Sequence, residues 1–312
     1  MANKILVTGG AGYIGSILVP ELLAAGNDVT VLDNFMYGQN SLAQLCNNPK
    51  FKVVNGDVRN QQLISELIKK AEVIIPLAAY VGAPLCARDP MGATSINHDA
   101  ILMMLRLLSK EQKILMPTTN SAYGTGGKNN YCNEESELRP MSQYAIEKVK
   151  IEEFLMNHPN AISFRLATVF GMSPRMRLDL LVNDFVYRAV KDGFIVLFES
   201  HFKRNYIHIR DIARVFIHGL NSFDEMKGNI YNVGLSSANI SKFELCIEIK
   251  KYIDKFVYIE APIGKDPDQR NYIVSNEKIE KTGFKPETSL QIGIEELMKG
   301  YQMIKNTKYG NV

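Results

Sequence analysis

The sequence has 312 residues, of which 46% are hydrophobic and 22% charged, and its formal net charge is +3. This length allows one large α/β domain or two modest ones, and so small a charge, without a basic stripe, argues against a nucleic-acid partner. No apolar run approaches the about 18 residues of a membrane span, and the N-terminus shows no signal-peptide pattern. We therefore expect a cytoplasmic protein with no membrane partner.

The first predicted elements are a buried strand over residues 4–7 and a helix that begins near Tyr13. Between them lies the segment TGGAGYIG, from Thr8 to Gly15. Glycines at a strand-to-helix turn let the backbone turn tightly and approach a pyrophosphate without a Cβ in the way. The N-terminus of the following helix offers free N–H groups and a positive dipole end to phosphates. This pattern predicts a dinucleotide site.

A second apolar strand, over residues 29–32, ends at Asp33. This acid lies about 20 residues past the glycines, where a ribose-binding carboxylate is expected. A carboxylate at that point accepts hydrogen bonds from both ribose hydroxyls and repels a 2′-phosphate. The sequence therefore predicts NAD, rather than NADP, as the cofactor.

Short apolar runs and helical periods continue to alternate up to residue 170. They predict strands at residues 51–54, 72–77, 113–118 and 161–169, and helices at residues 61–70, 97–110 and 142–156. Continuous apolar strands that alternate with helices are typical of a parallel sheet covered on both faces. We predict an α/β fold, namely a Rossmann-type doubly wound parallel sheet, with ligands outside the carboxyl ends of its strands.

The pattern changes at Gly171, where a basic, irregular segment precedes a helix predicted near residues 180–190. Later stretches are shorter, more charged and richer in Pro and Gly, which favours a smaller C-terminal substrate-binding lobe. We assign residues 1–170 to the NAD-binding domain and residues 171–312 to this lobe. Within residues 205–235, the strand-like segments 206–211 and 230–234 are expected to return to the first sheet.

The cysteines and histidines suggest no metal site. The four cysteines form no CxxC pair, and the five histidines form no HxxxH or HxH pair with carboxylates nearby. Scattered single thiols suit a reducing compartment. Cys86 lies in a Pro-bounded loop over residues 80–90, and we interpret its thiol as a packing group rather than a catalytic one.

Residues able to do chemistry follow the fifth predicted strand. Thr119 comes at its end, and Tyr144 and Lys148 lie on the next predicted helix. A spacing of four puts the phenol and the ammonium on one helical face, where the lysine is expected to lower the tyrosine pKa and make the phenolate accessible as a base. Tyr187 and Tyr301 are followed by lysine at the same spacing, but not after a hydroxyl-bearing strand end, so we interpret both as ordinary helix faces.

An ordered set of motifs runs through nearly the whole chain. It comprises TGGAGYIG, Asp33, Gly56-Asp57-Val58, Leu77-Ala78-Ala79, Asn97, Thr118-Thr119, Tyr144 to Lys148, RLATVFG at residues 165–171 and RNYIHIRD at residues 204–211. This set resembles the extended short-chain dehydrogenase/reductases and, within them, the NAD-dependent sugar-nucleotide epimerases and dehydratases. The resemblance implies an enzyme that binds NAD and a nucleotide sugar. It also implies a homodimer, here through the helices at residues 97–110 and 142–156.

The resemblance further implies a role for each matching residue. Tyr144 is the base, Thr119 is its hydrogen-bonding partner, and Lys148 binds the nicotinamide ribose. The implied cofactor contacts are Gly9, Gly12, Tyr13, Ile14, Gly15, Asp33, Asn34, Asp57, Val58, Leu77, Ala78, Ala79, Asn97, Tyr144 and Lys148. The implied substrate contacts are Val81, Asn120, Ser121, Arg175, Arg177, Asn183, Arg204 and Arg270, of which the arginines suit bidentate contact with a diphosphate.

Two positions bear on the reaction. Similar 4,6-dehydratases carry an acidic pair directly after the threonine, and similar 3,5-epimerase/reductases carry a cysteine there, but this chain has Asn120 and Ser121. The remaining Thr-Tyr-Lys set can remove a hydroxyl proton while hydride leaves C4 for NAD. A C4 dehydrogenase that releases the ketone and a 4-epimerase that reduces it again both stay open. The alternatives are a 4,6-dehydratase with another carboxylate and a non-catalytic NAD-binding regulator.

The segment from Ser173 to Asn183, together with residues 268–275, departs from the UDP-galactose 4-epimerase pattern. It looks more like epimerases of bacterial surface-polysaccharide pathways. A GDP-linked heptose or hexose is accordingly the expected substrate, with the base, the sugar and the fate of the ketone still open.

Overall fold

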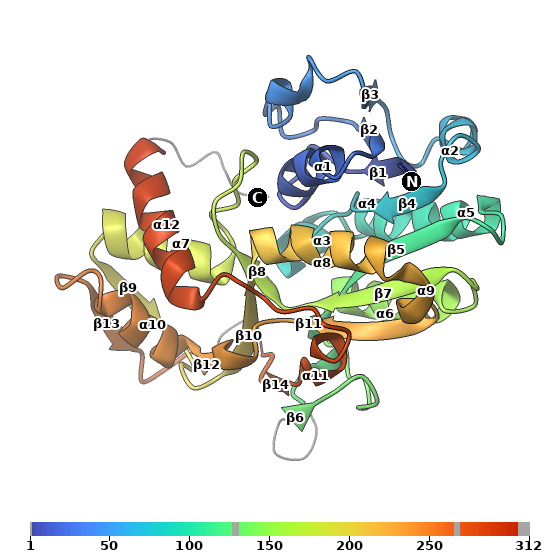
Figure 1. Cartoon of the computed structure of the whole chain (residues 1–312). Coiled ribbons are helices and arrows are strands. Elements are labelled where there is room, and N and C mark those ends of the chain that lie inside the picture. Colours follow the sequence, from blue (N-terminus) through green and yellow to red (C-terminus); the bar gives the residue numbers. More distant parts are fainter. Residues whose placement is uncertain (1, 127–130, 265–268, 305–312) are drawn as a thin grey trace.

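The computed structural model describes residues 2–126, 131–264 and 269–304. Its largest feature is a sheet of seven strands in the order β11-β7-β5-β4-β1-β2-β3, all parallel (Figure 1). They are β1 (Lys4–Thr8), β2 (Asp28–Asp33), β3 (Phe51–Asn55), β4 (Val73–Pro76), β5 (Lys113–Thr119), β7 (Ala161–Leu166) and β11 (Asn229–Val233). The chain winds outward from β1 in one direction and from β4 in the other, which confirms the predicted Rossmann-type doubly wound sheet.

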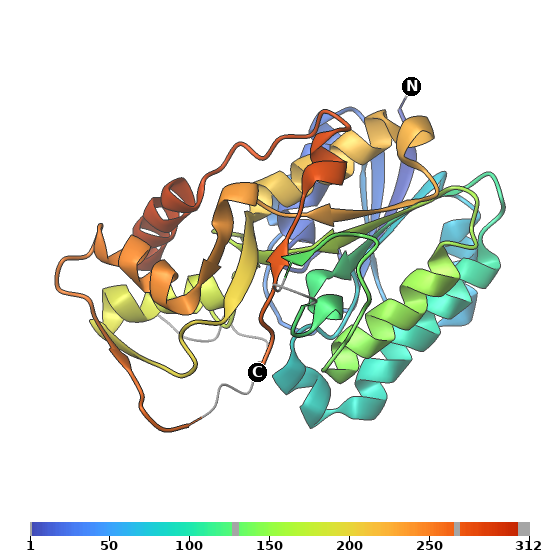
Figure 2. The same ribbon diagram turned by 90° about the horizontal axis from the view of Figure 1, so that it is seen from below.

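Helices cover both faces of this sheet because its side chains alternate between two hydrophobic cores. On β1, Ile5 and Val7 belong to the core under α1 (Gly15–Ala24) and α8 (Ile209–Asn221). Leu6 belongs to the core under α2 (Gln61–Ile68), α5 (Ala100–Leu107) and α6 (Gln143–Leu155). Figure 2 shows these two helical layers on opposite sides of the sheet.

Three short helices lie in the connections of this layered part. They are α3 (Ala83–Arg88), α4 (Pro90–Thr94) and α9 (Phe223–Met226). A π-helical segment, Ser95–Asp99, joins α4 to α5. The helix predicted over residues 97–110 is therefore shorter, because α5 begins only at Ala100 and ends at Leu107.

Two strand predictions need correction. The strand predicted over residues 161–169 is two strands, since the chain leaves the large sheet at Ala167 and continues as β8 (Thr168–Phe170). The segment at 206–211 does not return to the large sheet. Its strand, β10 (Lys203–His208), pairs with β8 and with β12 (Asn239–Ser241) in a separate three-stranded sheet.

The remaining elements form a smaller part, at the left of Figure 1, beside the carboxyl ends of the large sheet. Its helices are α7 (Leu181–Lys191), α10 (Lys242–Lys250) and α12 (Leu290–Met303), and β9 (Phe194–Leu197) pairs with β13 (Val257–Glu260). Another strand pair, β6 (Tyr131–Cys132) with β14 (Ile273–Val274), lies near α11 (Glu277–Glu280). The division into domains at residue 170 stays a prediction.

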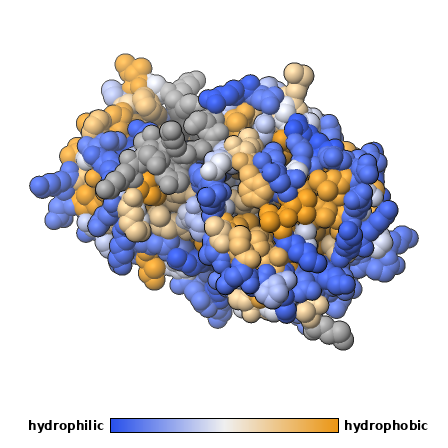
Figure 3. Space-filling model, turned by 90° about the horizontal axis from the view of Figure 1, so that it is seen from above, coloured by the Kyte–Doolittle hydropathy of each residue, from blue (hydrophilic) through white to orange (hydrophobic). Residues whose placement is uncertain are grey.

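The surface mixes hydrophilic and hydrophobic residues. On the face drawn in Figure 3, hydrophobic residues gather in the right half of the view among hydrophilic ones. Within the described ranges, no helix has both the length and the apolar character that crossing a membrane requires.

Candidate active site

A cavity of about 770 Å³ opens at the carboxyl ends of β1, β2, β4 and β5 and continues to β9 and α7. Most of the residues implied by the sequence line it, although they come from distant parts of the chain. Those that do are Gly9, Gly12, Tyr13, Ile14, Gly15, Asp33, Asn34, Asp57, Val58, Leu77, Ala78, Ala79, Val81, Thr119, Ser121, Tyr144, Lys148, Arg175, Arg177, Arg204 and Arg270. The fold thus brings the predicted cofactor and substrate residues to one cavity.

The glycine turn between β1 and α1 has no room for a side chain at Gly9 or at Gly15. Gly9 has a φ of +68°, and a Cβ there would lie 2.5 Å from the backbone nitrogen of Ala78 at the end of β4. A Cβ on Gly15 would lie 2.4 Å from the carbonyl oxygen of Gly10. Within the part of the chain that the structure describes, no side chain caps the N-terminus of α1, and its first turn has no acidic residue. This uncapped helix end, facing the cavity over glycines, fits the pyrophosphate of a dinucleotide.

Asp33 is held in place by the backbone. Its Oδ2 accepts a hydrogen bond from the N–H of Ala11 (2.9 Å), and its Oδ1 accepts one from the N–H of Phe35 (2.8 Å). Each oxygen keeps a lone pair for a further donor, so the carboxylate can still bind ribose hydroxyls. Asp57 is also on the cavity wall, where a hydrogen bond from Arg59 lowers the pKa of its carboxyl.

Helix α6 presents Tyr144 and Lys148 to the cavity. Its first turn is fixed by Ser142, whose Oγ accepts a hydrogen bond from the N–H of Ala145 (3.2 Å). The Lys148 Nζ lies 6.0 Å from the centre of the Tyr144 ring and donates a hydrogen bond to the carbonyl oxygen of Pro117 (3.3 Å). The lysine is 3% exposed, and burial lowers its pKa to about 8.

The expected lowering of the Tyr144 pKa by Lys148 is not found. Burial, and next the nearby Cys86, raise the pKa of Tyr144 to about 12, while Arg177 and Arg270 oppose this rise. The direction of the Lys148 amine and the burial of Tyr144 explain the difference. The amine points to the end of β5, where it donates to a backbone carbonyl oxygen, and burial of the phenol outweighs the effect of the charges around it.

The end of β5 contacts the C-terminal part of the chain. The Oγ1 of Thr119 accepts a hydrogen bond from the N–H of Ser121 (3.1 Å), which leaves its own hydroxyl hydrogen available. Arg270 donates a hydrogen bond to the Oγ of Ser121, across 149 residues of sequence. Asn120 is fully buried and does not line the cavity, and its amide has no hydrogen-bond partner among the described residues.

The segment from Gly171 to Leu180 crosses the N-terminal end of α1. Ser173 and Ser16 share a hydrogen bond (2.7 Å), and the Tyr13 hydroxyl donates one to the carbonyl oxygen of Gly171 (2.7 Å). The guanidinium carbon of Arg175 lies 3.8 Å from the centre of the Tyr37 ring. Tyr37 belongs to the loop that follows Asp33. The side chain of Arg175 therefore lies beside the predicted adenosine end of the cavity, away from Tyr144.

Arg177 lies nearer the catalytic helix than Arg175 does. It pairs with Asp179 (2.5 Å) and is one of the charges that act on Tyr144. Arg204 is 1% exposed, donates to the carbonyl oxygen of Lys203 (3.0 Å) and lies 5.8 Å from the centre of the Tyr272 ring.

Two implied ligands support the cavity from behind instead of lining it. The amide of Asn97 holds the backbone of Tyr80, accepting from its N–H (2.8 Å) and donating to its carbonyl oxygen (3.0 Å). The amide of Asn183 accepts from the N–H of Gly171 (3.0 Å) and donates to the carbonyl oxygen of Arg177 (2.8 Å). Both asparagines are fully buried.

Several cavity residues escaped the sequence reasoning. They include Tyr37, Gln39, Phe198, Lys242 and Gln269. Lys242 is the clearest case, because as the first residue of α10 it reads as an exposed helix residue, yet it is 4% exposed and donates to the carbonyl oxygen of Phe198. Nothing in the local pattern distinguishes it from a surface lysine.

The thiol of Cys86 is 1% exposed and donates a hydrogen bond to the carbonyl oxygen of Tyr80 (3.4 Å). Burial raises its pKa, which disfavours the thiolate. No cluster of three or more His, Cys, Asp or Glu residues suited to a metal ion occurs in residues 2–126, 131–264 and 269–304.

Comparison with known proteins places this site in a family. A family model described as the NAD dependent epimerase/dehydratase family matches residues 5–234. The chain belongs to this family. The family assignment made from the motifs is confirmed, and with it an NAD-dependent enzyme of the sugar-nucleotide epimerase and dehydratase class.

Similar proteins from several organisms match along almost their whole length. A putative UDP-glucose 4-epimerase from Methanocaldococcus jannaschii is 28% identical, over 94% of this chain and 97% of its own. The low-salt glycan biosynthesis protein Agl12 from Haloferax volcanii is 26% identical, over 95% and 98%. A dTDP-glucose 4,6-dehydratase from an Actinoplanes species is also 26% identical, over 96% and 98%. The relatives therefore include different reactions.

Solved structures share the fold. The UDP-glucose 4-epimerase of Thermus thermophilus, in complex with NAD, matches with a TM-score of 0.81 and 23% identity over 96% of this chain and 99% of its own. The dTDP-glucose 4,6-dehydratase of Bacillus anthracis, also in complex with NAD, matches with a TM-score of 0.82 and 22% identity over 99% of both chains. Epimerase and dehydratase share one architecture, so the reaction must be inferred from side chains.

Proposed function

We propose that this enzyme oxidises the C4 hydroxyl of a nucleotide-activated sugar, as a C4 dehydrogenase or a 4-epimerase. Tyr144 would act as base, Thr119 as its hydrogen-bonding partner and Lys148 as a cofactor ligand. The observation that supports this proposal is that α6 and β5 bring these three side chains into the cavity that the glycine turn also lines.

Each side chain has a chemical task at the C4 oxygen. When bound, NAD supplies the acceptor for the hydrogen on C4. Tyr144 takes the proton of the hydroxyl, and the positive charges of Arg177 and Arg270 favour its phenolate. Thr119 can donate its hydroxyl hydrogen to the same substrate oxygen, because its lone pair already accepts from the N–H of Ser121.

Elimination of water would need an acid, and neither of the two residues after Thr119 is one. These residues are Asn120 and Ser121. Among the described residues, the groups that act on the pKa of Tyr144 are Cys86, Arg177 and Arg270, and none of them is a carboxylate. We therefore favour oxidation at C4 over a 4,6-dehydratase reaction and over a non-catalytic NAD-binding regulator, which has no need of this set.

The proposed substrate is a GDP-linked heptose or hexose for bacterial surface-polysaccharide synthesis. The cavity supports a nucleotide substrate because Arg204 and Arg270 line it together with Phe198, Lys242 and Gln269. The two arginines suit a diphosphate.

Mass spectrometry of the products tests this proposal. The purified enzyme is incubated with GDP-, UDP- and dTDP-sugars, with and without added NAD. A product that has lost two hydrogens indicates a C4 dehydrogenase, and a new isomer of unchanged mass indicates a 4-epimerase. A product that has lost one water would establish the dehydratase instead, and NAD binding without any turnover would favour the regulator.

Tyr144→Phe tests the assigned base. General acid–base catalysis contributes about 100-fold to 10,000-fold, so turnover should fall by at least 100-fold while NAD still binds. Tyr187→Phe is the matched control, because Tyr187 has a lysine four residues later on α7 but does not line the cavity. Full activity in Tyr144→Phe would remove this residue from the mechanism.

We further propose a cytoplasmic homodimer that forms through α5 and α6. These helices pack side by side, and their outer faces carry partly exposed apolar residues, including Leu102, Met103 and Phe154. Light scattering coupled to gel filtration should give twice the mass of the chain. A Phe154→Glu variant should shift that mass toward the monomer.

A further inference from the structure

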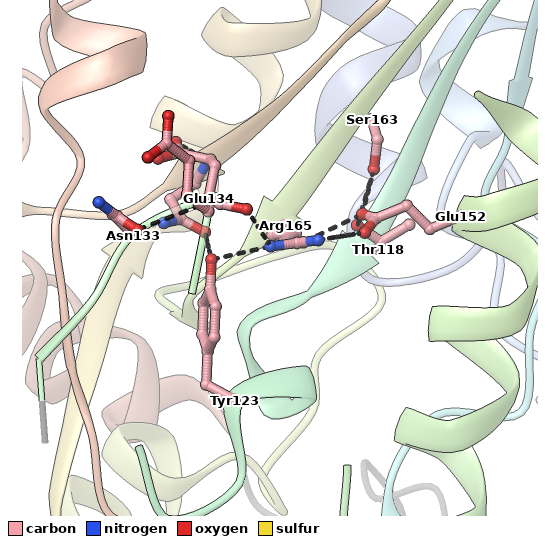
Figure 4. A network of polar contacts seen from close by, with 9 residues as sticks. Thr118, Tyr123, Asn133, Glu134, Glu152, Ser163 and Arg165 are labelled. Carbon is pink, nitrogen blue, oxygen red and sulfur yellow. Dashed lines mark hydrogen bonds and ion pairs between the residues drawn. The ribbon is translucent and has the colours of Figure 1, made fainter. Parts of the chain in front are cut away.

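A buried polar network lies directly behind the catalytic helix (Figure 4). Tyr144, Lys148 and Glu152 follow one another at intervals of four on α6, so they share one face of the helix. The first two reach the cavity, whereas Glu152 lies beneath it and is 4% exposed. The same helical face therefore carries both the catalytic groups and an internal charge.

Glu152 anchors α6 to two neighbouring strands. Its carboxylate accepts hydrogen bonds from the hydroxyls of Thr118 on β5 (2.8 Å) and Ser163 on β7 (2.7 Å). It also pairs with Arg165 of β7, through Nη2 at 2.5 Å and Nε at 3.0 Å. Thr118 directly precedes Thr119, so the network fixes the strand end that carries one catalytic group to the helix that carries the other two.

Arg165 also contacts Tyr123, on the side of its guanidinium that faces away from Glu152. Its Nη1 donates a hydrogen bond to the Tyr123 hydroxyl (3.0 Å), which in turn donates to the Oδ1 of Asn232 (2.7 Å). Burial raises the pKa of Tyr123 to about 12, so its hydroxyl stays protonated and able to donate. One guanidinium thus joins the catalytic helix to the turn that follows β5, as Figure 4 shows.

Tyr123 in turn contacts the segment that carries Arg270. Its ring packs edge-on against Tyr272, with the ring centres 6.3 Å apart. The N–H of Asn271 donates a hydrogen bond to the carbonyl oxygen of Gly124 (3.1 Å). Arg270 itself bonds to Ser121, so the substrate arginine is docked onto the turn that Arg165 holds from behind.

We propose that Glu152 and Arg165 are positioning residues for the Tyr144–Lys148 face of α6, and that Tyr123 extends this positioning to the segment that carries Arg270. The buried ion pair acts by fixing positions, because a charged pair contributes little net stability compared with apolar residues of similar volume. The planar guanidinium of Arg165 holds Glu152 and Tyr123 in fixed positions, because it donates to both at once. The inference rests on the proposed function of Tyr144 and Lys148.

The decisive variant replaces both charges, Glu152→Leu with Arg165→Met. Removing the pair together leaves no unpaired buried charge, so the protein should fold. A small misplacement of catalytic groups costs up to about 100-fold in rate. We expect the rate of hydride transfer to fall at least about tenfold. The absorbance of NADH measures this rate, which is expressed per folded, NAD-loaded enzyme. A parental rate in this variant overturns the proposal, whatever its stability.

Tyr123→Phe tests the extension to Arg270 and removes a single oxygen atom, so it keeps the proposal testable if the double variant fails to fold. The Glu152 cluster remains, so kcat should stay within about twofold. The KM for the nucleotide sugar should rise about tenfold, because the turn that holds Arg270 loses a hydrogen bond to a charged group. Tyr231→Phe is the matched control, since Tyr231 is buried on β11 at 4% exposure and lies outside the cavity wall. Parental kcat and KM in Tyr123→Phe overturn the link.

Chemical labelling gives a readout that needs no substrate. Acetylation of Lys148 by acetic anhydride is followed by peptide mass spectrometry across a pH series. Lys148 is protected and titrates near its pKa of about 8 in the parent, and the double variant should label faster and titrate higher. If the parent converts none of the nucleotide sugars tested, the proposed function fails, and the labelling alone then tests the positioning role. A parental labelling profile in the double variant then overturns the positioning role.

Discussion

Replacing Lys148 by methionine should stabilise the NAD-free protein at neutral pH. The ammonium is 3% exposed, and burial lowers its pKa from 10.5 to about 8. The folded state disfavours the charged form of this lysine. Its ammonium therefore destabilises the folded protein at a pH below its folded pKa, and this effect is gone above its unfolded pKa. Stability of the parent therefore falls as the pH decreases from about 10.5 to 8.

The magnitude follows from the shift in pKa. A difference of this size is worth about 3 kcal/mol at pH 7, at 1.36 kcal/mol for each pH unit. Methionine also loses the hydrogen bond to the carbonyl oxygen of Pro117, which is worth about 1 kcal/mol. Lys148→Met should thus gain about 2 kcal/mol in the free energy of unfolding at pH 7. At pH 9.5 the folded amine is neutral, and the gain should fall to about zero.

Chemical denaturation followed by circular dichroism at the two pH values measures this difference. Lys150→Met is the matched control, because Lys150 lies on the same helix but is exposed, and its change should stay within about 0.5 kcal/mol at both pH values. A Lys148→Met protein that is less stable than the parent at pH 7, or a gain that is equal at both pH values, would refute the reasoning. The same variant should lose turnover.

Other consequences of the structure can be checked separately. Asp33→Ala should erode the preference for NADH over NADPH, measured by fluorescence titration, since the carboxylate that repels a 2′-phosphate is gone. Gly9→Ala should abolish NAD binding, because a Cβ there meets backbone, whereas Gly26→Ala should cost only the strain of its positive φ, about 1–2 kcal/mol, and still bind NAD. Under native conditions a thiol reagent should label the exposed Cys46 and spare the buried Cys86, which peptide mass spectrometry can show.

The large sheet was predictable because its signals are local. Each strand is a short apolar run bounded by polar residues, and β1, the glycine turn and Asp33 follow one another within the first two strands. The departure of β8 and β10 into another sheet was not predictable in the same way. The β8 strand continues the apolar run of β7 after Ala167, and β10 is mostly polar in sequence, so the partners of both strands are set by tertiary packing.

The site was predictable where one helix or one turn carries it, as for Tyr144 and Lys148. It was less so where distant segments meet. The contact of Arg270 with Ser121 spans 149 residues, and the stacking of Arg175 on Tyr37 joins two loops whose proximity no spacing reveals. The pKa of Tyr144 also depends on burial, which acts against the local effect of a neighbouring lysine.

Three residues that act against folding lie on or beside the helix that carries Tyr144. Lys148 is a buried ammonium, and Asn120 is a buried amide that lacks a hydrogen-bond partner among the described residues. Glu147 is 2% exposed, and its Oε2 likewise has no hydrogen-bond partner among them. All three lie on α6 or directly after β5. Burying polar groups without full hydrogen bonding costs stability, so the grouping of these residues supports the proposed site. If Lys148→Met is more stable than the parent and yet loses turnover, the lysine costs stability and is needed for the reaction.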